Sequence, residues 1–239
     1  MGDSMSTTIQ IIPAFNLALA FVPVIAVFWL LYHWSLDLTN AVYAIVRMLI
    51  QLLLVGYLLT TIFKSESVWL VVAVLIVMVT AASWIALGTV KSQRLQLYKY
   101  TLYSVVLGGG FTLALVTQSV ITLEPWFEAK YMIPLAGMIF ANSMNSISLA
   151  AERLHAERAR DVPYDKARNM AFQAAFIPVI NSMFAVGLVA LPGMMTGQIL
   201  SGVSPIVAAH YQIVVMCMIF GSAGLSTALF LKMAKPLLD

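Results

Sequence analysis

The side chains of this chain that could contact a solute are carboxamides, hydroxyls and thioethers inside long apolar stretches. They are Met138, Asn142, Asn145, Asn181 and Ser182. At helical spacing, Met138, Asn142 and Asn145 fall on one stripe of a predicted helix, and the other two lie at similar depth in the next. Polar groups in the middle of neighbouring apolar helices predict a polar path between them. The alternative is that they only hydrogen-bond one helix to another.

Arg47 is the charged residue that lies deepest within an apolar stretch, and Gln51 follows four residues later on the same helical face. A charge inside a membrane helix is costly and usually faces the bundle or a wet cavity, which would add both residues to the path. The alternative is that Arg47 reaches the nearby headgroups, since two helical turns are about 10 Å.

Motifs for catalysis, nucleotide binding and resident metal binding are absent from the sequence. No G-x-x-x-x-G-K-[ST] or H-E-x-x-H motif occurs, and Cys217 is the single cysteine. Methionine, with 14 copies, could supply soft thioether ligands, but it is also a common filler of apolar helices. We therefore expect no catalysis, no ATP hydrolysis, no bound cofactor and no metal site in this chain alone.

Composition places the chain among membrane proteins. Of its 239 residues 62% are hydrophobic and 10% are charged, and the mean hydropathy is +0.94. Apolar runs that could each cross about 30 Å of hydrocarbon predict an all-α polytopic protein, with one transmembrane domain over residues 1–239. The seven runs are 14–34, 40–63, 68–87, 100–122, 131–151, 169–191 and 206–231. The net charge of +3 and the lack of a basic stripe argue against nucleic acid as a partner.

Lysine and arginine are distributed unevenly among the predicted loops. With the N-terminus outside, the inward segments carry ten of these cations, whereas the outward segments carry only Lys64 and Lys130. Because cytoplasmic loops are enriched in Lys and Arg, we expect an external N-terminus and a cytosolic C-terminus. The N-terminal residues lack a basic region, so the first apolar run is expected to be retained as a span.

A charged segment, 152–168, separates the fifth and sixth apolar runs. It holds nine of the chain's 23 charged side chains, so it must lie in water where the chain turns outside the bilayer. Pro163 suits the first turn of a helix, where its missing N–H needs no partner. We expect a short cytosolic helix that starts at Pro163 and docks on a partner. A solvated turn without a partner is the alternative.

The last outward segment, 192–205, is uncharged and mostly apolar, unlike a loop in water. Small residues let backbones approach closely, and folded-back backbone at membrane depth is tolerated only against protein or a wet cavity. We expect a re-entrant segment or outer gate that includes Pro192, Gly193, Met194, Met195, Gly197 and Gly202. The alternative is that the sixth helix runs on and turns late.

Several runs of the sequence resemble one family of transport proteins. They are AIVRMLIQLLLVGYLL, PLAGMIFANSMNSISLAAERL and VGLVALPGMMTGQILSGVSPIVAAHYQIVVM, the last followed by AGLSTAL. Together they resemble the FetB-type permeases, the membrane subunits of the bacterial FetAB iron exporter, to which plant half-transporters linked to aluminium tolerance are similar. The resemblance covers most of the chain, from about Tyr43 to Leu229.

The resemblance implies a permease subunit of the cell membrane, the inner membrane in a bacterium. Such a subunit pairs with a separate ATP-binding-cassette ATPase, normally as two copies of each. ATP and Mg²⁺ would then be bound by the partner ATPase and not by this chain. The segment that the resemblance implies for coupling to the ATPase contains Val162, Pro163, Tyr164, Asp165, Lys166 and Arg168.

The expected function is export of a metal ion such as iron, or of a metal complex, driven by ATP that the partner hydrolyses. An ATPase-independent channel or secondary carrier is the alternative, although the spans lack the acidic residues typical of proton coupling. A membrane-bound scaffold or sensor would bind a partner without moving a solute.

Overall fold

A computed structural model describes residues 12–63 and 67–238 of the chain. The N-terminal residues, expected outside, and Lys64, counted among the outward cations, lie outside the described residues. The chain divides into two units, Met1–Ser65 and Glu66–Asp239, and each is described by itself.

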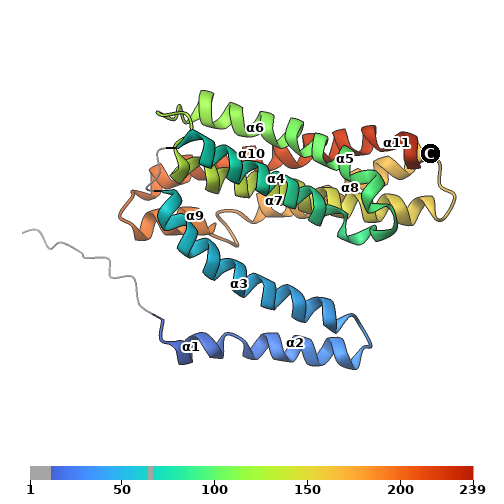
Figure 1. Cartoon of the computed structure of the whole chain (residues 1–239), viewed down its shortest axis with the longest axis horizontal. Helices are drawn as coiled ribbons and strands as arrows, with labels where there is room; N and C mark the ends of the chain where they lie inside the picture. The colour runs from blue at the N-terminus through green and yellow to red at the C-terminus, as the bar shows by residue number, and fades with distance from the viewer. Residues whose placement is uncertain (1–11, 64–66, 239) are drawn as a thin grey trace, which may run out of the picture. The chain divides into compact units, whose positions relative to one another are not determined.

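The first unit contains α1 (Ala14–Leu19), α2 (Val22–His33) and α3 (Leu38–Ile62) (Figure 1). A turn at Ala20 and Phe21 separates α1 from α2, and Pro23 lies in the first turn of α2, where a missing N–H is harmless. The Asp37 carboxylate caps α3 by accepting a hydrogen bond of 2.9 Å from the Asn40 backbone N–H. This cap confirms the turn expected between the first two apolar runs.

The second unit is a bundle of helices (Figure 1). Its α-helices are α4 (Val68–Ala86), α5 (Arg94–Ser104), α6 (Gly110–Leu115), α7 (Ala129–Arg158), α8 (Tyr164–Ala185), α9 (Gly193–Leu200), α10 (Pro205–Met233) and α11 (Lys235–Leu238). The 3₁₀ turns η1 (Leu87–Thr89) and η2 (Lys91–Gln93) join α4 to α5. The π-helical turns η3 (Val105–Gly109) and η4 (Val116–Val120) flank α6. The fourth span, predicted over 100–122, begins earlier, because most of the residues expected to form the loop before it belong to η2 and the start of α5.

Six helical stretches in the described parts of the chain are long and apolar enough to cross a membrane. They are Ala14–His33, Leu38–Ile62, Val68–Thr89, Lys91–Val120, Ala129–Arg158 and Pro205–Met233. The expected all-α polytopic fold is confirmed. These six stretches do not include the run predicted over 169–191, most of which lies in α8. That helix ends at Ala185 and carries charged and amide side chains in its first turns, which lower its apolarity. The orientation expected from lysine and arginine stays a prediction.

Helix α10 packs against α7 and η3 at the centre of this unit. The Ser226 Oγ donates a hydrogen bond to the Ser143 Oγ at 3.2 Å, and the Ser143 Oγ donates to the Ser222 carbonyl at 3.3 Å. Such small side chains allow helices to approach closely. Gly108 in η3 makes the closest approach, because a Cβ at this position would lie 2.6 Å from the Ser226 backbone nitrogen. The contact of η3 with α10 therefore requires glycine at position 108.

Replacing Gly108 with alanine should destabilise the second unit, because the new methyl group would overlap the Ser226 backbone. Over-packing of this kind costs about 1–3 kcal/mol, so we expect a lower apparent melting temperature of the detergent-purified protein. The control is Gly110→Ala, since a Cβ there would have no heavy atom within 4 Å. Equal melting temperatures of the two variants would contradict the close packing of η3 against α10.

Candidate functional site

A cavity of about 440 Å³ lies in the second unit, where α7, α8, α9 and α10 meet. Several residues singled out from the sequence line it, namely Met138, Asn142, Ser182, Pro192, Gly193 and Met194. Helix α7 contributes the first two, α8 the third, and the start of α9 the remainder. The structure therefore brings part of the expected polar path together with part of the expected outer gate.

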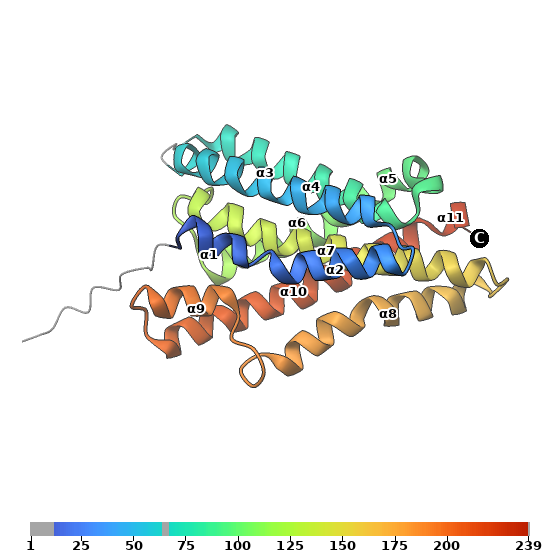
Figure 2. The same cartoon turned by 90° about the horizontal axis from the view of Figure 1, so that it is seen from below.

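A tight turn between α8 and α9 brings α9 to this cavity. Helix α8 ends at Ala185, and Gly187 has a φ of +80°, a backbone conformation that favours glycine. The Gly187 N–H donates to the Ala190 carbonyl at 3.0 Å, and α9 begins at Gly193. Helix α8 therefore does not run on to a late turn. Figure 2 shows α9 beside α10, which it contacts, but re-entry of this segment into the membrane stays a prediction.

One N–H of the Asn142 amide and the Ser182 hydroxyl donate hydrogen bonds within their own helices. The Asn142 Nδ2 donates to the Met138 carbonyl at 2.8 Å, and the Ser182 Oγ donates to the Val179 carbonyl at 2.7 Å. Bonds of this kind to the preceding helical turn satisfy polar groups locally. They do not tie one helix to another, so these residues can still offer a solute the acceptors Asn142 Oδ1 and Ser182 Oγ and the second N–H of the Asn142 amide.

Gln212 on α10 is a cavity residue that the sequence analysis missed. Its side chain is 6% exposed, and its Oε1 atom is buried without a hydrogen-bond partner among the described residues. An unpaired buried acceptor costs roughly 1–3 kcal/mol, so this atom favours a ligand or water that can donate. The sequence did contain a signal, because Gln212 is an amide inside an apolar run, like Asn142 and Asn181 in the two preceding apolar runs.

Other residues expected to form the path or the gate do not line the cavity, namely Asn145, Asn181, Met195, Gly197 and Gly202. The side chains of Asn145 and Asn181 are exposed. Arg47 and Gln51 lie on α3 in the first unit, where both are exposed. Their part in a polar path stays a prediction.

The side chains that line the cavity carry no charge. No cluster of three or more His, Cys, Asp or Glu residues occurs in the parts of the chain that the structure describes. Hard and borderline divalent cations bind carboxylates, imidazoles or thiolates. The cavity therefore suits a solute of low charge, which would be held by shape and by a few hydrogen bonds.

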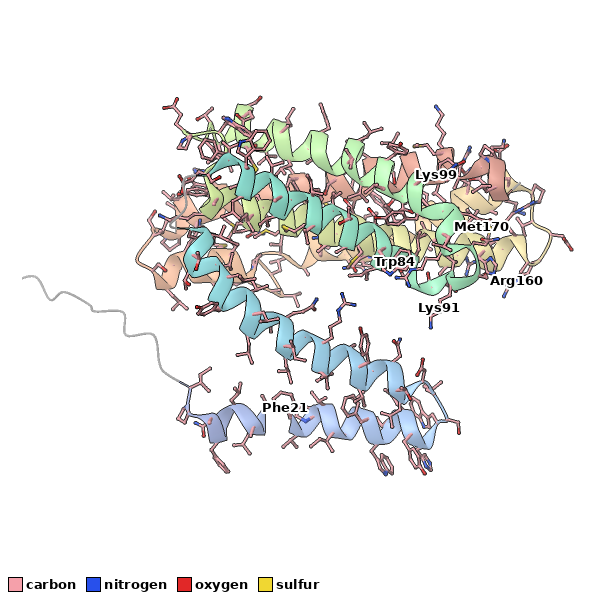
Figure 3. The ribbon with its side chains drawn as sticks, viewed as in Figure 1. Phe21, Trp84, Lys91, Lys99, Arg160 and Met170 are labelled. Atoms are coloured by element: carbon pink, nitrogen blue, oxygen red, sulfur yellow. The ribbon has the colours of Figure 1, made fainter. Side chains whose placement is uncertain are left out.

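The turn between α7 and α8 lies at the other end of these two helices (Figure 2). Helix α7 extends to Arg158, and α8 begins at Tyr164 and continues without a break to Ala185. The expected short helix is therefore the first turn of a long one, with Pro163 as its N-cap residue. Figure 3 shows Arg160, Lys91 and Lys99 at this same end of the unit, which we call the basic end.

Side chains of α7 hold this turn in place. The Glu157 side chain is 4% exposed, and its carboxylate lies 2.7 Å from the Arg153 guanidinium and 3.8 Å from that of Arg160. The Arg158 Nη1 donates a hydrogen bond to the Val162 carbonyl at 3.0 Å. The residues just before α8 are therefore fixed relative to the end of α7.

Tyr164 joins the turn to α10. Its side chain is 3% exposed, and its hydroxyl donates to the Leu231 carbonyl in the last turn of α10, where carbonyls lack helical partners. The Asp165 Oδ1 accepts a hydrogen bond from Arg168 at 3.0 Å and lies 3.8 Å from the Lys235 Nζ, just beyond α10. A displacement of the turn would therefore act on the end of the helix that also carries the cavity residue Gln212.

Comparison with known proteins places the chain in a family. It matches the family described as "Uncharacterised protein family (UPF0014)" over residues 14–164 and 159–237. It is 36% identical to a UPF0014 membrane protein of Synechocystis sp. over 76% of each chain. No solved structure matches the chain.

Two further relatives have names that refer to transport or to a metal. The chain is 31% identical to the "Probable iron export permease protein FetB" of Escherichia coli, over 89% of this chain and 86% of the relative. It is 32% identical to "Protein ALUMINUM SENSITIVE 3" of Arabidopsis thaliana, over 88% of this chain and 81% of the relative. The resemblance to FetB-type permeases is thus confirmed. The chain is a multi-pass membrane protein, and it belongs to the UPF0014 family.

Proposed function

We propose that the chain is the membrane permease of an ATP-binding-cassette exporter, whose separate ATPase subunit binds Mg²⁺ and hydrolyses ATP. The observation that carries this proposal is that α7, α8 and α10 link a cavity at one end to a charged turn at the other. The Escherichia coli relative, named "Probable iron export permease protein FetB", supports the same function. The cargo is a metal ion such as iron, or a metal complex, and it leaves the cytosol.

In this proposal the α7–α8 turn lies in the cytosol and docks on the ATPase, with two copies of each subunit in the exporter. Closure of the ATPases on ATP moves the turn, and the bond between Tyr164 and Leu231 passes the movement to α10. The movement changes access to the cavity from the inner to the outer side. ATP can drive such a switch only if the ATP-bound and the ATP-free ATPase favour different permease states.

Replacing Lys166 with glutamate should weaken docking of the ATPase, because this lysine is exposed on the first turn of α8. We expect roughly tenfold weaker binding, or ~1.4 kcal/mol, and a matching loss of ATP-driven flux in proteoliposomes. The control, Lys130→Glu, makes the same charge change at the opposite end of α7. ATP-driven flux at the wild-type rate in the Lys166 variant would contradict the coupling role of this turn. Flux through the permease without any ATPase would indicate a channel or secondary carrier instead.

Replacing Tyr164 with phenylalanine should uncouple ATP hydrolysis from transport, because it removes the hydroxyl that bonds the Leu231 carbonyl. One such bond contributes about 1 kcal/mol, so the protein should fold and still co-purify with an active ATPase. The measured quantity is cargo moved per ATP hydrolysed, which should fall. Tyr103→Phe is the control, since Tyr103 is 56% exposed. An unchanged ratio in the Tyr164 variant would show that the bond transmits nothing.

Replacing Gln212 with leucine should lower cargo transport without lowering stability. The change removes a buried acceptor that has no partner among the described residues, so the melting temperature should stay equal or rise. Transport at low cargo concentration should fall roughly tenfold if the cargo donates a hydrogen bond to this atom, the equivalent of ~1.4 kcal/mol. Gln96→Leu is the control, because Gln96 is exposed on α5. Loss of stability together with transport would indicate a structural role only.

A further inference from the structure

A groove of about 530 Å³ lies between α8 and α10 at the basic end of the second unit. It is separate from the cavity described above, and the two share no lining residue. Its polar side chains are Arg168, Asn169, Gln173 and Lys232, and its apolar ones include Phe172 and Leu231. The groove thus joins a cationic patch to an apolar floor.

The polar side chains of the groove offer hydrogen-bond donors and positive charge. The Asn169 Oδ1 already accepts from the Arg168 Nε and Nη2 at 3.2 and 3.1 Å, which leaves the Asn169 Nδ2 as a donor. The Arg168 charge is partly balanced by Asp165 at 3.0 Å. Lys232 is exposed and forms no salt bridge within the described part of the chain. A ligand that fits must therefore carry negative charge and acceptor oxygens.

The apolar side of the groove requires a second property of the ligand. Leu231 is buried at 1% exposure, and the Phe172 ring stacks on Phe176 with their centroids 4.6 Å apart. The Phe176 ring in turn packs edge-on against Phe220 of α10, so the aromatic contacts continue into the bundle. A free anion would contact only the cationic end, whereas an amphipathic anion would cover both parts.

We propose that this groove binds an anionic phospholipid, with the phosphate against Lys232 and the Asn169 amide and an acyl chain along Phe172. The chain is a multi-pass membrane protein, and basic grooves between membrane helices at the headgroup level recognise anionic lipids. The lipid would lie beside Arg168 and the first turns of α8, and would so hold α8 to the end of α10. This proposal requires no ATPase and no cargo, so it can be tested independently of the proposed function.

The test is a titration of the full-length, detergent-purified protein with dioleoyl phosphatidylglycerol, dioleoyl phosphatidylcholine or inorganic phosphate. Thermal unfolding reports binding, and native mass spectrometry counts the lipids retained. We expect phosphatidylglycerol to raise the melting temperature more than phosphatidylcholine, and phosphate to have no effect. Lys232→Gln should weaken phosphatidylglycerol binding about fivefold, and Lys232→Arg should restore it.

The matched control is Lys91→Gln, which removes an exposed lysine at the same basic end but outside the groove (Figure 3). This variant should bind phosphatidylglycerol like the wild type. Equal stabilisation by phosphatidylcholine, or equal loss in the two glutamine variants, would overturn the proposal in favour of non-specific lipid contact. Stabilisation by phosphate alone would overturn it in favour of a free-anion site. Because Lys232 is exposed, its replacement should not alter the lipid-free melting temperature.

Discussion

Polar groups between apolar helices must find hydrogen-bond partners within the protein, and the second unit is arranged around that constraint. The hydroxyls of Thr101, Thr112 and Thr117 each donate to the carbonyl four residues earlier, at 3.2, 2.8 and 2.8 Å. These bonds leave the helix surfaces free to pack by shape. The Oε1 atom of Gln212 is an exception, because it is buried without a partner among the described residues, in a residue that lines the cavity.

Helix α10 connects the two ends of the proposed transport path. Its 29 residues span about 44 Å at 1.5 Å per residue. Gln212 lies near its start, the contact with Gly108 lies at Ser226, and the carbonyl of Leu231 lies in its last turn. A helix that packs closely along its length moves as a unit or bends at a defined place. The two π-helical turns beside it, η3 and η4, are irregularities of the kind that often mark functional sites.

The sequence predicted the features that depend on composition and local turn chemistry. The apolar runs are mainly helical, a turn separates the first two runs where Asp37 caps α3, and Asn142 and Ser182 line one cavity. The features that the sequence did not predict depend on which helices pack against one another. Whether a glutamine such as Gln212 is buried, or a tyrosine such as Tyr164 reaches another helix, is decided by packing between segments far apart in the chain.

The π-helical turns escaped prediction for a similar reason, because each changes the helical repeat only slightly and leaves the apolar run unbroken. The early end of α8 is different. A glycine at 187 and a proline at 192 were visible in the sequence, but the helix could have ended at either. The hydrogen bond from the Gly187 N–H to the Ala190 carbonyl closes a turn directly after Ala185, so the helix has the earlier of the two ends.

The uncharged lining of the cavity constrains the form in which a metal cargo could pass. A bare divalent ion that left water here would meet only uncharged side chains, mostly aliphatic ones with a few amide, hydroxyl and thioether groups, and no anionic ligand would offset its lost hydration. A metal whose charge is already balanced by its own ligands avoids this cost, and those ligands can donate a hydrogen bond to Gln212. For an exporter of iron, the cavity therefore favours a complexed or partly hydrated metal over a naked ion. The selectivity of the permease would then depend on the ligands around the metal as much as on the metal itself.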